Sequence, residues 1–299
     1  MKILFSFPGQ GAQRPGMLHA LPDGDALLNE ASEVLAEDVR LLDSAEALEH
    51  TRAVQLCLLI AGVAAAHALQ RQGVMPDMTA GLSIGAYPAA VMAGALDFSD
   101  ALRLVSLRGT LMEQAYPQGY GLTAIVGFSE QQLRPLLGDD CWLANINGPQ
   151  QLVIAGSNEA MARVAAAVRA DGARCARRLA VSVPSHCALL DKPARELEKA
   201  FSGITLHPPR CAYLSGSSAR VLWQPEKIAD DLALNMARTV NWYEAMVAAN
   251  EREVRLAIEM PPGRVLTGLT RPAFGEGEAI SLEQSGEALV CRLATRLRA

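Results

Sequence analysis

The stretch from 75 to 96, MPDMTAGLSIGAYPAAVMAGAL, constrains the fold more than any other part of the sequence. Its second half is rich in alanine and apolar on every side, so a helix there must be buried. Gly81 to Gly85 fit the pattern G-x-S-x-G, in which a tight turn between a strand and a helix exposes a serine hydroxyl near the helix N-terminus. Ordinary Gly/Ser turns share this pattern, so on its own it makes Ser83 only a candidate nucleophile.

Predicted strands and helices alternate on both sides of this turn. Alternation of this kind implies a mostly parallel sheet covered by helices on both faces. Together with the serine turn, it predicts an α/β-hydrolase-like core that is formed discontinuously by residues 1–120 and 184–299. The strands are predicted at 2–7, 212–215 and 254–260, and the helices at 48–70, 189–201, 225–236, 243–250 and after Gly263.

The intervening residues 121–183 have a different rhythm and are predicted to form an inserted subdomain. Ser129 begins a short helix in this segment, and Asn158 is predicted to cap a longer one. The resulting order, β-α-β-β-α-β, is that of a ferredoxin-like subdomain. The six elements are predicted at 122–128, 129–137, 141–147, 150–157, 158–170 and 173–181.

Charge and composition exclude several classes of function. The formal net charge of −5 argues against a nucleic-acid-binding protein, which needs a basic surface. The six cysteines form no C-x-x-C pair and have no histidine at ligand spacing, so we expect neither a metal site nor redox chemistry. The longest apolar run, 56–69, falls short of the ~20 residues that span a bilayer. We expect a cytoplasmic protein with no membrane segment.

Arg108 lies inside a mostly apolar predicted helix that begins at Ser99 as its cap. A guanidinium in such a place needs an anionic partner. One possibility is a nearby carboxylate of the protein, reached by a side chain that extends toward solvent. The other is the carboxylate of a bound ligand. The sequence pattern leaves both open.

His186 is the best placed of the five histidines to act as a base. It lies in VPSHC, where the predicted insertion rejoins the core, and it follows Ser83 in the chain as the histidine follows the serine in α/β-hydrolases. Its neighbour Cys187 is interpreted as a buried bystander, because adjacent residues of an extended chain point to opposite sides. A histidine near a strand end can also be purely structural.

Several separated blocks of the sequence resemble the malonyl-CoA:acyl-carrier-protein transacylases. The resemblance covers nearly the whole chain and the blocks keep the order seen in that family, so together they are far more specific than the serine motif. The resemblance implies an acyltransferase that passes malonyl from malonyl-CoA to a carrier thiol. The blocks are FPGQGAQ (7–13), GLSIGAYPAAVMAGAL (81–96), LRGTLMEQA (107–115), NINGPQQLVIAG (145–156), VPSHCALL (183–190) and PPGRVLTGLT (261–270).

The resemblance also implies roles for individual residues. Ser83 would carry the malonyl group as an ester, and His186 would activate first the serine and later the acceptor thiol. Gln10 and the backbone N–H of Ile84 would stabilise the oxyanion. Arg108 would pair with the free malonyl carboxylate. The backbone carbonyl of about Asn235 would orient His186 in place of an acid, and no cofactor or metal would be required.

Two positions beside the nucleophile depart from the usual family pattern, G-H-S-L-G-E. Leu82 stands in place of the histidine and Ala86 in place of the acid. With these changes the chain most resembles the epsilon subunit of bacterial malonate decarboxylase, which loads malonyl onto the phosphoribosyl-dephospho-CoA group of that enzyme's acyl-carrier subunit. We therefore expect this function, with other decarboxylase subunits as partners. The alternatives are a transacylase of fatty-acid or polyketide synthesis, a thioesterase or carboxylesterase, and a non-catalytic subunit that docks a carrier.

Overall fold

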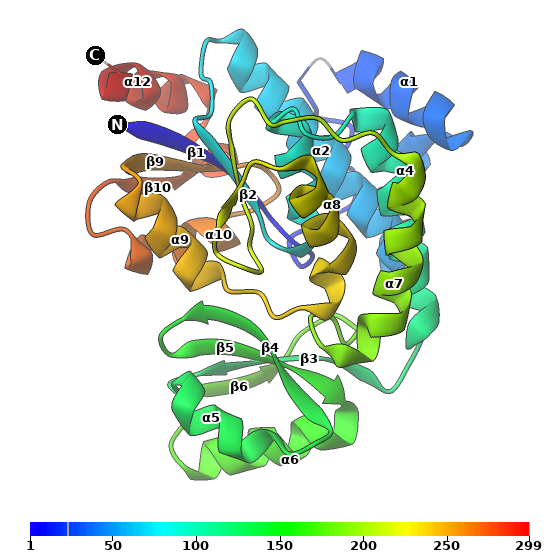
Figure 1. Cartoon of the computed structure of the whole chain (residues 1–299), viewed down its shortest axis with the longest axis vertical. Coiled ribbons are helices and arrows are strands. Elements are labelled where there is room, and N and C mark those ends of the chain that lie inside the picture. Colours follow the sequence, from blue (N-terminus) through cyan, green and yellow to red (C-terminus); the bar gives the residue numbers. More distant parts are fainter. Residues whose placement is uncertain (23, 299) are drawn as a thin grey trace.

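A computed structural model describes residues 1–22 and 24–298 of the chain and contains two sheets (Figure 1). The larger sheet has the strand order β10-β9-β1-β2-β7-β8, and all its neighbours are parallel except the pair β7 and β8. The predicted α/β fold with a mostly parallel sheet is thereby confirmed. Its strands are β1 (Lys2–Phe7), β2 (Met78–Gly81), β7 (Ala212–Leu214), β8 (Val221–Leu222), β9 (Val254–Glu259) and β10 (Glu278–Ser281).

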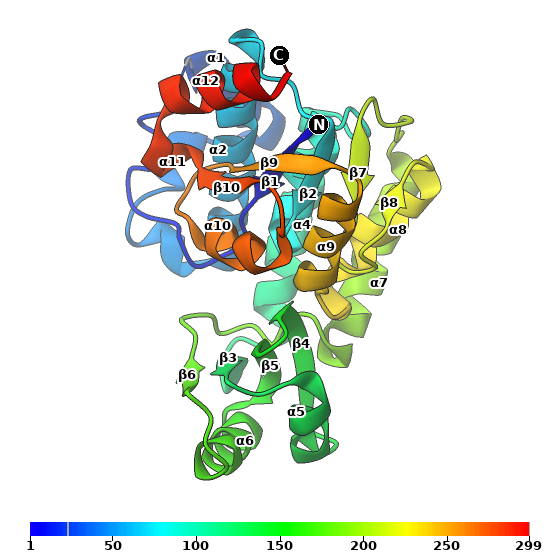
Figure 2. The same cartoon turned by 90° about the vertical axis from the view of Figure 1, so that its left-hand side faces the viewer.

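Helices cover both faces of this sheet. Alternate residues of its strands point to opposite sides, and the strands carry apolar side chains on both sides that the helices bury. In β1, Ile3, Phe5 and Phe7 belong to the larger hydrophobic cluster, whereas Leu4 belongs to a second cluster with α9 and α10. Figures 1 and 2 show the two groups of helices, and both termini lie at the end of the core farthest from the small sheet. The helices of the core are α1 (Gly24–Leu35), α2 (Thr51–Arg71), α3 (Ala86–Met92), α4 (Phe98–Ala115), α7 (Asp191–Ala200), α8 (Pro225–Leu234), α9 (Trp242–Glu251), α10 (Val265–Thr270), α11 (Leu282–Ser285) and α12 (Glu287–Arg298).

The central helix of the core is α2. Its length and composition would suffice to cross a membrane, but 89% of its apolar window is buried inside the fold. It packs against α3, which follows the serine turn, and against α4, which carries Arg108. The burial on all sides explains why this helix shows no clear polar face in the sequence.

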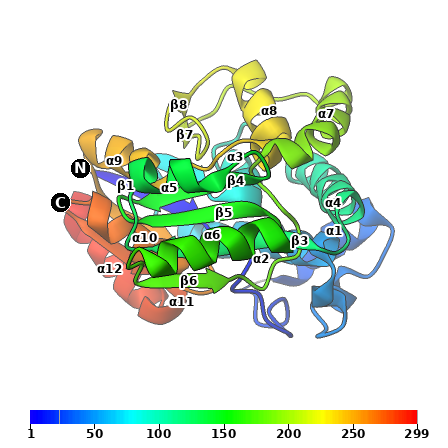
Figure 3. The same ribbon diagram turned by 90° about the horizontal axis from the view of Figure 1, so that it is seen from below.

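Residues 120–178 form a four-stranded antiparallel sheet of order β4-β5-β3-β6. Figure 3 shows α5 and α6 lying side by side across its outer face, and these helices and that face enclose their own hydrophobic cluster. The chain order is the β-α-β-β-α-β order expected of a ferredoxin-like unit. The elements are β3 (Tyr120–Val126), α5 (Glu130–Leu137), β4 (Cys141–Gly148), β5 (Gln151–Ser157), α6 (Asn158–Ala170) and β6 (Cys175–Arg178).

The small sheet is joined to the core through β4. The backbone N–H of Ile146 donates to the carbonyl of Val240, and the N–H of Val240 donates to the carbonyl of Ala144. The inner face of the sheet packs on Cys187, whose thiol donates to the carbonyl of Pro184. Burial raises the pKa of this thiol to about 12, so it is a structural residue rather than a reactive one.

Helix boundaries agree with the sequence prediction at one cap and differ at two. Ser129 caps α5 as predicted, with a reciprocal contact to Gln132. Asp97 rather than Ser99 occupies the N-cap position of α4, and Ser157 rather than Asn158 caps α6 by accepting from the N–H of Ala160. The predicted caps lie one or two residues inside the helices, because the cap is defined by the backbone angles of a single residue.

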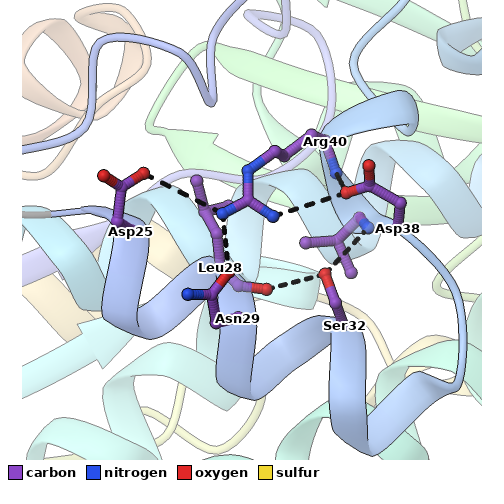
Figure 4. A network of polar contacts seen from close by, with 7 residues as sticks. Asp25, Leu28, Asn29, Ser32, Asp38 and Arg40 are labelled. Carbon is purple, nitrogen blue, oxygen red and sulfur yellow. Dashed lines mark hydrogen bonds and ion pairs between the residues drawn. The ribbon is translucent and has the colours of Figure 1, made fainter.

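A polar network holds the segment after α1 in place (Figure 4). The guanidinium of Arg40 donates to Asn29 at 2.8 Å and points between Asp25 and Asp38. The hydroxyl of Ser32 donates to the carbonyl of Leu28 and accepts from the backbone N–H of Val39. Because such exposed ion pairs contribute little free energy, we assign this network to loop shape rather than to stability.

Candidate active site

Ser83 sits on a strained turn at the carboxyl end of β2. Its φ of +58° lies in the left-handed region, which residues other than glycine rarely adopt. A Cβ at Gly81 would lie 1.9 Å from the carbonyl carbon of Gly85, and a Cβ at Gly85 would lie 2.1 Å from the carbonyl oxygen of Phe7. Both glycines of the motif are therefore required by close backbone contacts. The turn continues into α3 and projects the hydroxyl from the edge of the sheet.

His186 contacts this hydroxyl across a sequence separation of a hundred residues. Its Nε2 lies 2.9 Å from Ser83 Oγ. Its Nδ1 lies 2.8 Å from the carbonyl oxygen of Asn235 and 3.2 Å from that of Arg238. Because carbonyl oxygens only accept hydrogen bonds, Nδ1 carries the proton and the lone pair of Nε2 faces the serine. The histidine is held in the tautomer that can take the serine proton, without help from a carboxylate.

Burial keeps this histidine neutral. Only 3% of His186 is exposed. Its pKa is lowered to about 4, chiefly by desolvation and also by the positive charge of Arg108, while the two backbone carbonyls act in the opposite direction. The imidazole is therefore ready to accept a proton at neutral pH.

Arg108 completes the group from α4 and is fully buried. Its Nη1 donates to Oε1 of Gln55 at 2.8 Å, and its Nη2 donates to Oδ1 of Asn235 at 3.0 Å and to Oγ of Ser83 at 3.1 Å. Within the described residues no carboxylate pairs with it, and its buried Nε has no hydrogen-bond partner. Of the two possibilities left by the sequence, the structure excludes a side chain extended to a protein carboxylate.

The charge of Arg108 is thus buried and uncompensated. Desolvation lowers its pKa to about 10, which still leaves it protonated at neutral pH. The ring of Tyr87, whose centroid lies 5.9 Å from the guanidinium carbon, supplies a weak electrostatic contact. A cation in these surroundings is strongly favoured to bind an anion that enters from outside.

Two amide side chains of the site were missed by the sequence analysis. Gln55 of α2 bridges Arg108 and Gln10, donating to Oε1 of Gln10 at 3.2 Å. The side chain of Asn235 holds Arg108 and donates to the carbonyl of Ser83 at 3.4 Å, whereas only its backbone carbonyl was expected to matter. The available signal for Gln55 was its position as an amide within the long apolar stretch of this buried helix.

One predicted oxyanion donor, Ile84, adjoins the serine, and the loop that carries the other, Gln10, packs against the residue before the serine. Ile84 follows Ser83 at the start of the helical turn, where the first N–H groups lack partners within the helix. Gln10 lies in the loop after β1. A Cβ at Gly9 would come within 2.9 Å of Leu82 Cδ2, so this loop rests on the leucine that precedes the nucleophile. Ala86, the other unusual position, is buried in the first turn of α3.

Comparison with known proteins gives consistent matches over the whole chain. A family model described as the acyl transferase domain matches residues 4–296. The malonyl CoA-acyl carrier protein transacylase of Escherichia coli K12 is 38% identical over 284 residues, which are 90% of this chain and 92% of that protein. The protein of the same name from Haemophilus influenzae is 36% identical over 296 residues, covering 94% and 95%.

Solved structures agree with these matches. FabD from Acinetobacter baumannii superposes with a TM-score of 0.93 at 30% identity, covering 99% of both chains. A malonyl-transacylase in complex with its type II polyketide synthase acyl-carrier protein superposes with a TM-score of 0.91 at 35% identity, covering 97% of this chain and 99% of that one.

Proposed function

Because the chain belongs to the acyl transferase family, we propose that it moves malonyl from malonyl-CoA to an acyl carrier protein through an ester on Ser83. It is an acyltransferase enzyme by its similarity to the malonyl CoA-acyl carrier protein transacylases over 90% and 94% of its length. The observation that carries the malonyl specificity is the fully buried Arg108, 3.1 Å from the Ser83 hydroxyl and without a carboxylate partner in the described part of the chain.

In the first half-reaction, His186 Nε2 takes the proton of the Ser83 hydroxyl as Oγ attacks the thioester carbonyl of malonyl-CoA. The negative charge that develops on the carbonyl oxygen is stabilised by the N–H of Ile84 and by Gln10. The carbon–sulfur bond breaks, and the CoA sulfur leaves with the proton from His186. The enzyme then holds malonyl as an ester, and the histidine is neutral again.

The second half-reaction runs the same steps with the carrier thiol. The thiol gives its proton to His186, and the thiolate attacks the ester carbonyl in the same oxyanion site. The bond from carbon to Ser83 Oγ breaks, and the serine recovers its proton from the histidine. No water or redox partner is consumed, since one thioester is exchanged for another.

Arg108 is proposed to select acyl groups that end in a carboxylate. A guanidinium presents parallel N–H donors that match the two oxygens of a carboxylate. The neutral oxygens of Gln55 and Asn235 orient the guanidinium without cancelling its charge. Malonyl therefore gains a buried, charge-assisted contact that acetyl lacks.

The carrier assignment differs from the expectation drawn from Leu82 and Ala86. The comparisons support a malonyl-CoA:acyl-carrier-protein transacylase, the alternative reading, and give no support to the malonate decarboxylase subunit. We therefore propose an acyl carrier protein as the acceptor. The Ser83–His186 contact also favours catalysis over the non-catalytic docking subunit.

The function is tested by incubating the protein with radiolabelled malonyl-CoA and locating the label by peptide mapping. Malonyl on the peptide that contains Ser83 is expected, and Ser83→Ala should abolish it. Chase with a holo acyl carrier protein should move the label to the carrier. Release of free malonate in place of transfer would identify a thioesterase. Transfer only to a carrier with the phosphoribosyl-dephospho-CoA group would restore the decarboxylase assignment.

A further inference from the structure

Asp231 is a buried carboxylate that the acyl-transfer steps do not use. It lies in the last turns of α8 and is 4% exposed. Its Oδ2 accepts from the hydroxyl of Tyr213 at 2.8 Å, and its Oδ1 accepts from the hydroxyl of Ser215 at 2.6 Å. Burial raises its pKa, and the two hydroxyl donors oppose that shift. A carboxylate is costly to bury, so its retention calls for a structural reason.

Ser215 extends this contact into the loop that follows β7. Its Oγ accepts from the backbone N–H groups of Ser217 at 3.2 Å and Ser218 at 3.0 Å. A hydroxyl has one proton to give, and here it goes to Asp231. The chain of hydrogen bonds from two N–H groups through the hydroxyl to the carboxylate is mutually reinforcing. Asp231 therefore fixes the shape of the loop 215–218.

The backbone of Asp231 and the loop 215–218 contact the two ends of the segment that holds the catalytic histidine. We call residues 235–238 the His186 cradle, because the carbonyls of residues 235 and 238 face its Nδ1 and the carbonyl of residue 236 accepts its backbone N–H. At the first residue of the cradle, the N–H of Asn235 donates to the backbone carbonyl of Asp231. After it, the N–H of Asn241 donates to the carbonyl of Gly216 at 2.7 Å, and its side-chain amide donates to Ser217.

The same network ties the cradle to the elements that carry Ser83. Leu214, which precedes Ser215, pairs with Ala80 of β2 in the parallel sheet. The hydroxyl of Tyr87, one turn after the nucleophile, donates to the carbonyl of Leu232 at 2.9 Å. The elements that carry His186 and Ser83 are thus both connected to the same buried polar cluster.

We propose that Asp231 and Ser215 are positioning residues, which keep the His186 cradle in register with Ser83. The inference rests on the proposed catalytic pair but concerns residues outside it. Without the carboxylate, the hydroxyls of Tyr213 and Ser215 lose their acceptor, and the loop and the end of α8 can shift independently. A displacement of ~1 Å is enough to cost up to about 100-fold in rate.

The test compares Asp231→Ala and Ser215→Ala with Glu259→Gln. Glu259 is another buried carboxylate, 1% exposed, which accepts from the N–H groups of Leu266 and Thr267 at the start of α10 and makes no contact with the cradle. One readout is the rate at which a fluorophosphonate labels Ser83, which needs an aligned histidine but no malonyl group. The other is kcat and KM of malonyl transfer by the whole protein.

Asp231→Ala and Ser215→Ala should both be labelled at least about 10-fold more slowly and lose kcat to the same extent, with KM changed less than about two-fold. Glu259→Gln should keep the wild-type labelling rate even where it lowers the unfolding midpoint as much. Asp231→Asn, which keeps one acceptor oxygen, should fall between Asp231→Ala and wild type. Ser215→Ala, which removes one oxygen atom, gives the answer if Asp231→Ala does not fold.

If Glu259→Gln slowed labelling as much as Asp231→Ala and Ser215→Ala do at matched stability, the effect would be a general structural one and the proposal would be overturned. Normal labelling in folded Asp231→Ala or Ser215→Ala would also overturn it. Wild-type protein that is labelled but does not transfer malonyl would refute the proposed function alone, and the comparison of labelling rates would still decide the role of Asp231. An unlabelled wild-type serine would overturn the catalytic pair and the inference together.

Discussion

The guanidinium of Arg108 contacts the hydroxyl of Ser83, with 3.1 Å between Nη2 and Oγ. The group proposed to bind the malonyl carboxylate therefore also touches the nucleophile, and the same nitrogen is shared with Asn235. An incoming carboxylate competes for this nitrogen and compensates a charge that lowers the pKa of His186. Binding of a diacid is thereby coupled to the basicity of the histidine.

Arg108→Ala should remove the preference for malonyl over acetyl. Loss of one partner of a buried charge pair costs about 2–5 kcal/mol. The kcat/KM for malonyl-CoA should therefore fall by the factor that corresponds to this loss of transition-state stabilisation. The value for acetyl-CoA should change little. Steady-state kinetics with both donors measure the ratio. Arg103→Ala is the matched control, because Arg103 lies on the same helix but is exposed and paired with Asp100; an unchanged ratio in Arg108→Ala would refute carboxylate selection.

Gln55→Glu should also weaken the preference for malonyl over acetyl, but by neutralising Arg108 rather than by removing it. The substitution keeps the shape of the side chain but places a carboxylate where a neutral oxygen lies 2.8 Å from Arg108. An internal ion pair would then compensate the guanidinium and compete with malonyl. We expect KM for malonyl-CoA to rise and the malonyl-to-acetyl ratio to fall, measured in the same assay. Gln114→Glu on the exposed side of α4 is the control, and a variant at position 55 with wild-type selectivity would contradict the neutral-acceptor explanation.

Activity should persist to unusually low pH. The pKa of His186 is lowered to about 4, chiefly by burial, so the histidine stays an unprotonated base until the pH falls toward that value. An ordinary histidine would lose this role near pH 6.5. The rate of Ser83 labelling between pH 4 and 8 reports the transition. In Arg108→Ala the acid limb should move to higher pH, because the cation that lowers the pKa is gone; a wild-type limb near 6.5 would show that His186 is hydrated in solution.

The same shift predicts how stability depends on pH. The folded pKa of His186 lies below its unfolded value, so the unfolded state binds more protons between about pH 4 and 6.5. The contribution of neutral His186 to the free energy of unfolding is therefore fully present above about pH 6.5 and is lost as the pH falls toward 4. Its size is on the order of 3 kcal/mol. Urea unfolding of the wild type and of His186→Gln at pH 7 and 5 should show a smaller loss in the variant, whose side chain cannot be protonated.

The sequence was sufficient to predict the parts of the site that depend on local pattern. The serine turn, the chain order and the apolar helix made Ser83, His186 and Arg108 candidates, and the resemblance to the transacylases gave each a role. Gln55 and the side chain of Asn235 could not be predicted in the same way, because their roles arise only when α2, α4 and the end of α8 converge on one guanidinium. Their contacts are a property of packing rather than of any short motif.

The fold shows the same division. The parallel sheet followed from alternation of strands and helices, whereas α1, β10 and α12 were not predicted. These peripheral elements fully bury few residues: α12 buries just Val290 and Ala294. The decarboxylase expectation rested on Leu82 and Ala86, which flank the serine turn. Residues beside the nucleophile carry no direct information about the carrier.

The close contacts at the serine turn give a prediction about stability rather than chemistry. In Gly81→Ala the new methyl group would lie 1.9 Å from the carbonyl of Gly85, where only backbone movement can relieve the overlap. Overpacking of this kind costs about 1–3 kcal/mol, and movement of the turn should also misplace Ser83. Gly268→Ala in α10 meets no atom within 4 Å and should be neutral or stabilising by roughly 0.5–1 kcal/mol, because alanine favours a helix over glycine. Chemical unfolding and Ser83 labelling of the two variants separate these outcomes, and a stable, fully active Gly81→Ala would mean that the turn is wider in solution than in this structure.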